Sequence, residues 1–154
     1  HNEAGYGKLT AESVSLTDGA SLINDGGDML INQGEYSSTT ADASTIQNIN
    51  GIANFGNELT LKNGSHLTNS GSLTTRWINV VNSEITNNYG GLYTDVLSIR
   101  NGSLDNSHDG KVRVKNQFDL YEGEITNQGE FTVGGLTWLR NMNASWLRSI
   151  SNVR

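Results

Sequence analysis

The chain of 154 residues contains no cysteine and no proline, and it is poor in hydrophobic residues. The missing cysteine excludes a disulfide scaffold and a cysteine zinc site. Hydrophobic residues make up 34% of the chain, below the roughly 45–50% of ordinary globular domains, so we do not expect a large compact core. No apolar run approaches the roughly 20 residues of a membrane helix, and we expect no membrane insertion within this segment.

Four small or polar residue types take the place of the missing apolar ones. Asn, Gly, Ser and Thr occur 20, 18, 16 and 14 times, which is 68 of the 154 positions. Leu, Ile, Val, Phe and Trp nevertheless recur regularly along the chain, which argues against a disordered protein. The length fits one domain covering residues 1–154.

One pattern recurs: two apolar residues spaced two apart, usually a glycine, and then an apolar residue two positions before an asparagine. Five copies are found at residues 14–29, 59–73, 78–92, 97–112 and 118–133. Their marker asparagines are Asn24, Asn69, Asn87, Asn106 and Asn127. The first gap has room for one more copy, which residues 52–56 partly supply. A repeat of about 20 residues indicates stacked structural units.

Within each unit, the apolar spacing of two predicts short β-strands rather than helices. A unit of this length has no room for a crossover helix between parallel strands. A coil that closes after each unit instead pairs every strand with its copy in the next coil. We therefore predict an all-β fold, a three-sided parallel β-helix of about seven coils. A β-sandwich is the alternative, because it also has many short strands separated by turns.

The marker asparagines have two expected roles at the turns. Asn and Gly tolerate the left-handed backbone conformation of a tight corner. Copies in successive coils lie about 4.8 Å apart, where their amides can form a hydrogen-bonded ladder, and a buried amide needs such partners. The missing proline fits this fold, since proline would remove a backbone donor from a strand that is paired on both sides.

Two segments depart from the repeat. Residues 35–48 contain few apolar residues, and we expect a projecting loop or insertion there. Residues 136–154 include Trp138, Met142, Trp146 and Ile150 at intervals of four. This spacing fits a short amphipathic helix or a terminal coil whose aromatic residues cap the solenoid.

The net charge of −6 is unevenly distributed. Residues 1–61 contain one basic and eight acidic residues, whereas residues 62–154 contain nine basic and eight acidic residues. The acidic half would repel a phosphate backbone, so we expect no nucleic acid partner. The basic cluster of Lys111, Arg113 and Lys115 alternates with valine, as on the solvent face of a strand. We hypothesise that the acidic region of one copy binds this cluster in another copy.

Three tyrosines are candidate ligand contacts, because they lie beside glycines or acidic turns: Tyr89, Tyr93 and Tyr121. Carboxylates also occur in pairs at turns, such as Asp105 with Asp109 and Glu122 with Glu124. A glycosidase needs such a pair, but acidic residues are common at turns in any protein. We find no nucleophile or metal-binding motif. We therefore assign no catalytic residue, no metal ligand and no cofactor, and we expect a role other than catalysis.

The repeated units, seen best in residues 64–74 and 123–132, resemble the passenger regions of bacterial autotransporters and related surface adhesins. This resemblance implies a right-handed parallel β-helix, export to the bacterial surface, and a role in cell adhesion, self-association or biofilm formation. The implied partner is a host surface protein, a glycan, or another copy of the chain. We expect these residues to be a fragment of such a passenger.

Two alternatives to an adhesin remain open on the sequence. Parallel β-helices also serve as polysaccharide lyases, glycosidases and glycan-binding tailspikes, so a carbohydrate-active β-helix is one of them. A bare scaffold that spaces another domain from the cell is the other. A cleft with two convergent carboxylates would favour the carbohydrate-active protein, and a smooth rod would favour an adhesin.

Overall fold

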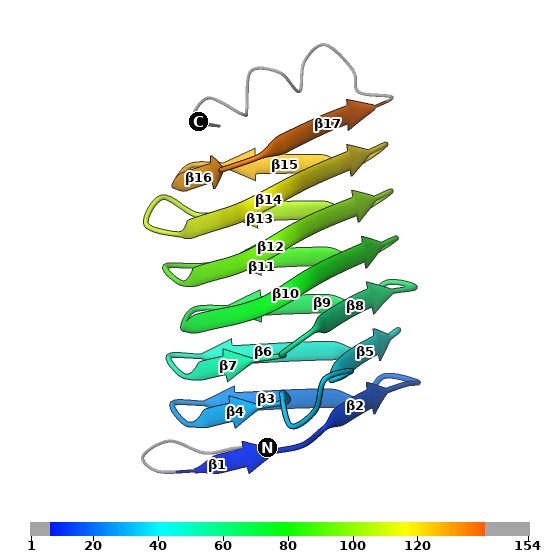
Figure 1. Cartoon of the computed structure of the whole chain (residues 1–154), viewed down its shortest axis with the longest axis vertical. Coiled ribbons are helices and arrows are strands. Elements are labelled where there is room, and N and C mark those ends of the chain that lie inside the picture. The colour runs from blue at the N-terminus through cyan, green and yellow to red at the C-terminus, as the bar shows by residue number, and fades with distance from the viewer. Residues whose placement is uncertain (1–6, 141–154) are drawn as a thin grey trace.

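The computed structural model describes residues 7–140, which form seventeen strands and no helix. Every strand pair is parallel, and the chain climbs through seven stacked coils (Figure 1). From the N-terminus upward, the chain runs left to right along the front of Figure 1 and returns right to left behind, so the β-helix is right-handed. This confirms the predicted solenoid rather than a sandwich. Among residues 7–140, no helix is long and apolar enough to cross a membrane.

Each complete coil contributes to three stacks of strands, which we call faces A, B and C. Face A contains β1 (Lys8–Thr10), β4 (Asp28–Leu30), β7 (Ile52–Asn54), β16 (Glu130–Val133) and the first halves of β10 (Ser72–Val81), β12 (Gly91–Arg100) and β14 (Lys111–Tyr121). Face B contains β2 (Ser13–Leu16), β5 (Ser38–Asp42), β8 (Glu58–Lys62), β17 (Leu136–Arg140) and the second halves of the same three long strands.

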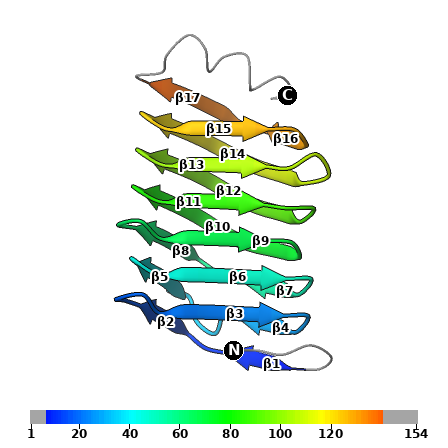
Figure 2. The ribbon, with the colours of Figure 1, turned by 180° about the vertical axis from the view of Figure 1, so that it is seen from behind.

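Faces A and B together make an eleven-stranded sheet that bends between them. Face C is a six-stranded sheet on the opposite side, seen from the front in Figure 2. It contains β3 (Ser21–Asp25), β6 (Thr45–Ile49), β9 (His66–Asn69), β11 (Glu84–Asn87), β13 (Ser103–Asn106) and β15 (Glu124–Asn127).

The core lies between the two sheets and is built from inward columns. Alternate residues of each strand point inward, and the register repeats them in every coil. One column of face C contains only buried aliphatic side chains: Leu22, Ile46, Leu67, Ile85, Leu104 and Ile125. Near the C-terminal end, the rings of Phe118 and Phe131 meet edge to face, with their centroids 5.3 Å apart. A few apolar residues per coil are therefore sufficient, which explains the low hydrophobic content.

The expected projecting loop over residues 35–48 is wrong for most of that segment. Residues 38–42 and 45–49 are strands β5 and β6. In β5, the buried Thr39 and Ala41 lie in register with Leu59 and Leu61 of the next coil. Small and polar side chains occupy inward positions here because the neighbouring coils impose the register.

The projecting segment is shorter and lies between β4 and β5, at residues 31–37 (Figure 1). It follows the bend between faces A and B. The backbone N–H of Gln33 donates to the carbonyl of Ala11 at 3.4 Å, and Gly34 approaches the side chain of Glu12. The segment therefore lies against the first coil.

The C-terminal segment begins as part of a further coil. Residues 136–140 form β17, which pairs with β14, so the helix alternative is wrong for these residues. The remainder of the expected terminal coil or cap, including Trp146, lies outside the described residues.

Candidate functional site

The asparagines predicted as turn markers form a ladder at the corner between faces C and A. Up to Asn106, each Nδ2 donates to the Oδ1 of the next asparagine along the solenoid, at 2.7–2.9 Å. Within residues 7–140 the ladder has six members: Asn24, Asn48, Asn69, Asn87, Asn106 and Asn127. The same Nδ2 also donates to the carbonyl of a turn glycine, as Asn87 does to Gly90 at 2.9 Å. The ladder satisfies buried amides and is structural.

Two details of this corner differ from the sequence analysis. The sixth member of the ladder is Asn48, whereas residues 52–56 had been assigned to that copy. The ladder asparagines also lie on strands, without the expected positive φ. Positive φ values of 48–56° occur at the corner between faces B and C, for example at Asn63 and Asn101. At the corner between faces C and A, positive φ occurs at Asn50 and Tyr89, which are not members of the ladder.

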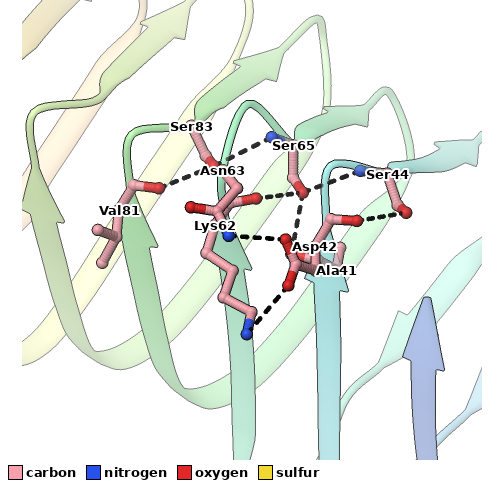
Figure 3. Close-up of polar contacts among 8 residues, drawn as sticks. All are labelled: Ala41, Asp42, Ser44, Lys62, Asn63, Ser65, Val81 and Ser83. Atoms are coloured by element: carbon pink, nitrogen blue, oxygen red, sulfur yellow. Dashed lines mark hydrogen bonds and ion pairs between the residues drawn. The ribbon is translucent and has the colours of Figure 1, made fainter. Parts of the chain in front are cut away.

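Serines stack at this second corner (Figure 3). The backbone N–H of Ser44 donates to Ser65 Oγ, and the N–H of Ser65 donates to Ser83 Oγ, both at 3.1 Å. Glycine takes this position in the next two coils, since a Cβ at Gly102 would lie 2.5 Å from the carbonyl oxygen of Ser83. The two corners account for much of the Asn and Gly content without any ligand.

The outer side of the bend between faces A and B has an open groove of about 490 Å³. Ligand sites typically have volumes of about 300–1,000 Å³. The groove crosses β10, β12, β14 and β16, and its lining residues are Thr74, Thr75, Tyr93, Thr94, Asp95, Arg113, Val114, Lys115, Thr132, Val133 and Gly134. One wall is a column of four residues in register: Thr74, Tyr93, Arg113 and Thr132. The groove therefore runs along the solenoid axis.

A glycine determines how the aromatic ring lies in this groove. An added Cβ at Gly91 would lie 2.6 Å from both Cε2 and Oη of Tyr93. The Tyr93 ring therefore lies back over Gly91, and a larger residue at position 91 would displace it. A tyrosine ring held in this way offers apolar contact area together with a polar hydroxyl.

The groove combines two cations with one carboxylate. Arg113 donates from Nε and Nη2 to Oε1 of Glu130 at 3.2 and 3.1 Å, an exposed pair of the kind that stabilises little. Lys115 makes no ion pair with any residue in the range 7–140. Asp95 is the single carboxylate among the lining residues.

Buried threonines hold the backbone beneath the groove. Oγ1 of Thr94 lies 3.0 Å from the carbonyl of Arg76 and 2.9 Å from that of Val96, so it bridges neighbouring coils where the sheet bends. Beside the groove, the guanidinium of Arg76 lies 5.3 Å from the centroid of the Trp77 ring. The site is therefore built on paired strands, which hold side chains more firmly than loops.

The predicted site residues divide between this groove and other places. Tyr93, Arg113 and Lys115 line it together, although the sequence analysis had placed the tyrosine and the cations in separate hypotheses. Lys111 lies on face A at the start of β14, outside the lining. Tyr89 is 73% exposed at the corner between faces C and A, with φ of +60°. Tyr121 ends β14 at the far edge of face B.

Sequence analysis did not identify the other eight lining residues as parts of a site, and Thr74, Asp95 and Thr132 are among them. Thr74 and Thr132 each follow an inward apolar residue in the repeat, as Tyr93 and Arg113 do. Aligning the copies by that residue would have brought the four into one column. The bend that makes the surface concave has no comparable sequence signal.

Within residues 7–140, no three His, Asp or Glu side chains are placed to hold a metal ion together. A comparison of the chain with models of protein families, with curated proteins and with solved structures finds no match in any of the three.

Proposed function

We propose that this chain is an adhesive segment of a β-helical protein of the bacterial surface, and that it binds its partner through the groove. The observation that carries the proposal is the convergence of Tyr93, Arg113 and Lys115 in one open groove on a rigid sheet. Aromatic residues and arginine are the types most enriched where proteins bind partners. The groove lies on the outside of the rod, so a large partner can reach it.

The architecture supports a role in adhesion. A parallel β-helix extends by adding coils, and each coil contacts only its neighbours, so it makes a rod with long side faces. Weak contacts become strong binding when many copies are tethered to one surface. The resemblance of the repeats to autotransporter passengers is consistent with such a role.

The carbohydrate-active alternative receives less support from the groove. Glycoside hydrolysis uses two carboxylates on either side of the scissile bond. Among the described residues, Asp95 is the single carboxylate that lines the groove. The groove therefore favours binding, and product release is tested in the same experiment.

The test uses beads coated with the 154-residue chain, scored for clustering and for retention on immobilised glycans and host matrix proteins. We expect the double variant Tyr93→Ala/Lys115→Ala to lose at least tenfold in binding. The control is Tyr89→Asn, which removes an exposed tyrosine outside the groove and keeps a residue that tolerates positive φ. The control variant should bind like wild type.

Three outcomes would overturn the proposal. Wild-type beads could neither cluster nor bind any surface. The groove variant could bind as well as wild type although circular dichroism shows it folded. Sugar chains with new reducing or unsaturated ends could appear in the wells, which would replace the proposal with the carbohydrate-active alternative.

A further inference from the structure

A short loop lies on the same outer bend as the groove, but in the second coil. This loop comprises residues 31–37. Its middle residues 33–36 are all exposed, and the side chain of Tyr36 is 79% exposed. Glu35 precedes this tyrosine. In Figure 1 the loop lies at the front of the molecule, on the same side as the long strands β10, β12 and β14 that carry the groove. An exposed tyrosine at the end of a loop is well suited to fill a hollow in a partner.

The eleven-stranded sheet with its bend is acidic in coils one to three and basic in coils four to seven. The first part contains two bases and five acids, a net charge of −3: Lys8, Lys62, Glu12, Asp28, Glu35, Asp42 and Glu58. The second part contains six bases and three acids, a net charge of +3: Arg76, Arg100, Lys111, Arg113, Lys115, Arg140, Asp95, Asp119 and Glu130. The two parts of the eleven-stranded sheet are thus complementary in charge.

The loop and the groove are also complementary in position. The loop belongs to coil two, and the groove cations Arg113 and Lys115 belong to coil six, about 19 Å further along the axis at 4.8 Å per coil. A two-fold axis along the strands of coil four, lying between two copies, would bring coil two of each copy opposite coil six of the other. Coils one to three of each copy then face coils five to seven of the other, which without Arg76 of coil four have a net charge of +2. A parallel pair would place like charges together.

Coil four supplies an aromatic centre for this arrangement, with the guanidinium of Arg76 beside it. Trp77 is 40% exposed on the outer side of β10. On the two-fold axis, Trp77 of one copy would meet Trp77 of the other. Aromatic residues at the centre of an interface, with charged residues around them, are the usual arrangement of a specific protein contact.

We infer that the groove binds the loop of residues 31–37 from a second copy of this chain, in an antiparallel pair with two-fold symmetry. Tyr36 of each copy enters the groove of the other beside Tyr93, and Glu35 pairs with Lys115. The inference rests on the proposed function, because it names the occupant of the same groove. Two copies on facing cell surfaces would run antiparallel, so this pairing joins cells.

Charge exchange tests the pairing in the full 154-residue chain. Glu35→Lys and Lys115→Glu should each weaken dimerisation at least tenfold in sedimentation velocity at low salt, because each brings like charges together twice. An equimolar mixture of the two variants should form a one-to-one heterodimer, since every contact again joins opposite charges. Glu124→Lys on face C is the control and should dimerise like wild type. Wild-type association should weaken as salt is raised.

Cross-linking tests the direction of the pair, and the absence of cysteine makes single-cysteine variants unambiguous. Ser72→Cys lies in coil four, so a short bis-maleimide should link two copies of this variant. Ser13→Cys lies in coil one, far from its own counterpart in an antiparallel pair, and should not link. Efficient linking of Ser13→Cys would indicate a parallel pair and would overturn the inference.

The outcomes separate this inference from the proposed function. If folded wild type is monomeric, or if the mixed variants stay monomeric, the loop is not the occupant. If the Tyr93→Ala/Lys115→Ala beads still lose binding to a glycan surface in that case, the proposed function stands with a glycan in the groove. If binding does not depend on the groove at all, both proposals fail.

Discussion

At the scale of single residues, the most informative side chain is the ladder asparagine at the corner between faces C and A. An amide can donate on one side and accept on the other, so a stack of amides with a spacing of about 4.8 Å satisfies itself without water. The stacking also excludes larger residues nearby, since a Cβ at Gly71 would overlap the carbonyl oxygen of Gly51. Asparagine and glycine are therefore required at this corner by contacts between coils.

Replacing a central member of the ladder should be costly. In Asn87→Ala, the Oδ1 of Asn106 loses its donor and the Nδ2 of Asn69 loses an acceptor. A buried polar group left without its partner costs about 1–3 kcal/mol, so we expect the free energy of unfolding to fall by about 3 kcal/mol in urea denaturation. Asn116→Ala, at an exposed position of β14, should change it by less than about 0.5 kcal/mol. Equal effects of the two substitutions would contradict a structural ladder.

The ladder also shows how far single residues could be predicted. All six members share the apolar-x-Asn spacing, and for Asn48 the apolar residue is Ile46. Asn48 was missed because the segment of residues 35–48 is otherwise poor in apolar residues and was interpreted as a loop. The local spacing was present in the segment, but its overall composition was given more weight.

At the scale of elements, the strands were predictable but their joining was not. A period of two identifies most of the strands from their own residues, whereas β5 and β6 were interpreted as a loop. It does not show that β10, β12 and β14 run without interruption from face A to face B. The groove lies at that bend. The sequence identifies Tyr93 and Lys115 individually, but it does not indicate that they lie on one surface.

The ends of β5 and β8 are joined by a small polar cluster (Figure 3). Asp42 accepts a hydrogen bond from Nδ2 of Asn63 at 2.8 Å and lies 3.2 Å from Nζ of Lys62. These two contacts, with the Asn63 bond the larger, hold the pKa of Asp42 below its ordinary value of 3.8. A lowered pKa in the folded state contributes stability above the ordinary value, and this stability is lost as the pH falls through the folded value.

The lowered pKa of Asp42 leads to a prediction for this cluster. Asn63→Gly keeps the positive φ at no steric cost and removes the main hydrogen bond, so the pKa of Asp42 should rise toward 3.8 in an NMR titration. In Asp42→Asn, the free energy of unfolding should fall less between about pH 5 and pH 2 than in wild type. A pKa of Asp42 that is unchanged in Asn63→Gly would show that the bond does not hold the carboxylate.

At the scale of the whole molecule, the uneven distribution of charge along the sequence becomes a separation of charge along the solenoid axis. The eleven-stranded sheet is acidic at its N-terminal end and basic at its C-terminal end, because every coil adds to that sheet in order. The uneven charge along the sequence suggested self-association, but it did not indicate which surfaces of the two copies meet. The sheet, its loop in coil two and its groove in coils four to seven supply those surfaces for the proposed pair.

Stability should also be distributed coil by coil, because each coil packs only on its neighbours. Phe131 lies in coil seven and packs on Phe118 of coil six, and replacing a buried phenylalanine with alanine costs about 3–5 kcal/mol. In Phe131→Ala, amide hydrogen exchange should quicken in β14 to β17 and stay at the wild-type rate in β1 to β6. The matched change at the other end, Leu22→Ala in coil one, should give the reverse pattern.

Because the groove lies in the affected coils and the loop does not, Phe131→Ala should weaken binding to the groove while the loop of residues 31–37 still docks into wild-type partners. A uniform rise in exchange over residues 7–140 for either variant would instead show that all seven coils unfold as one unit.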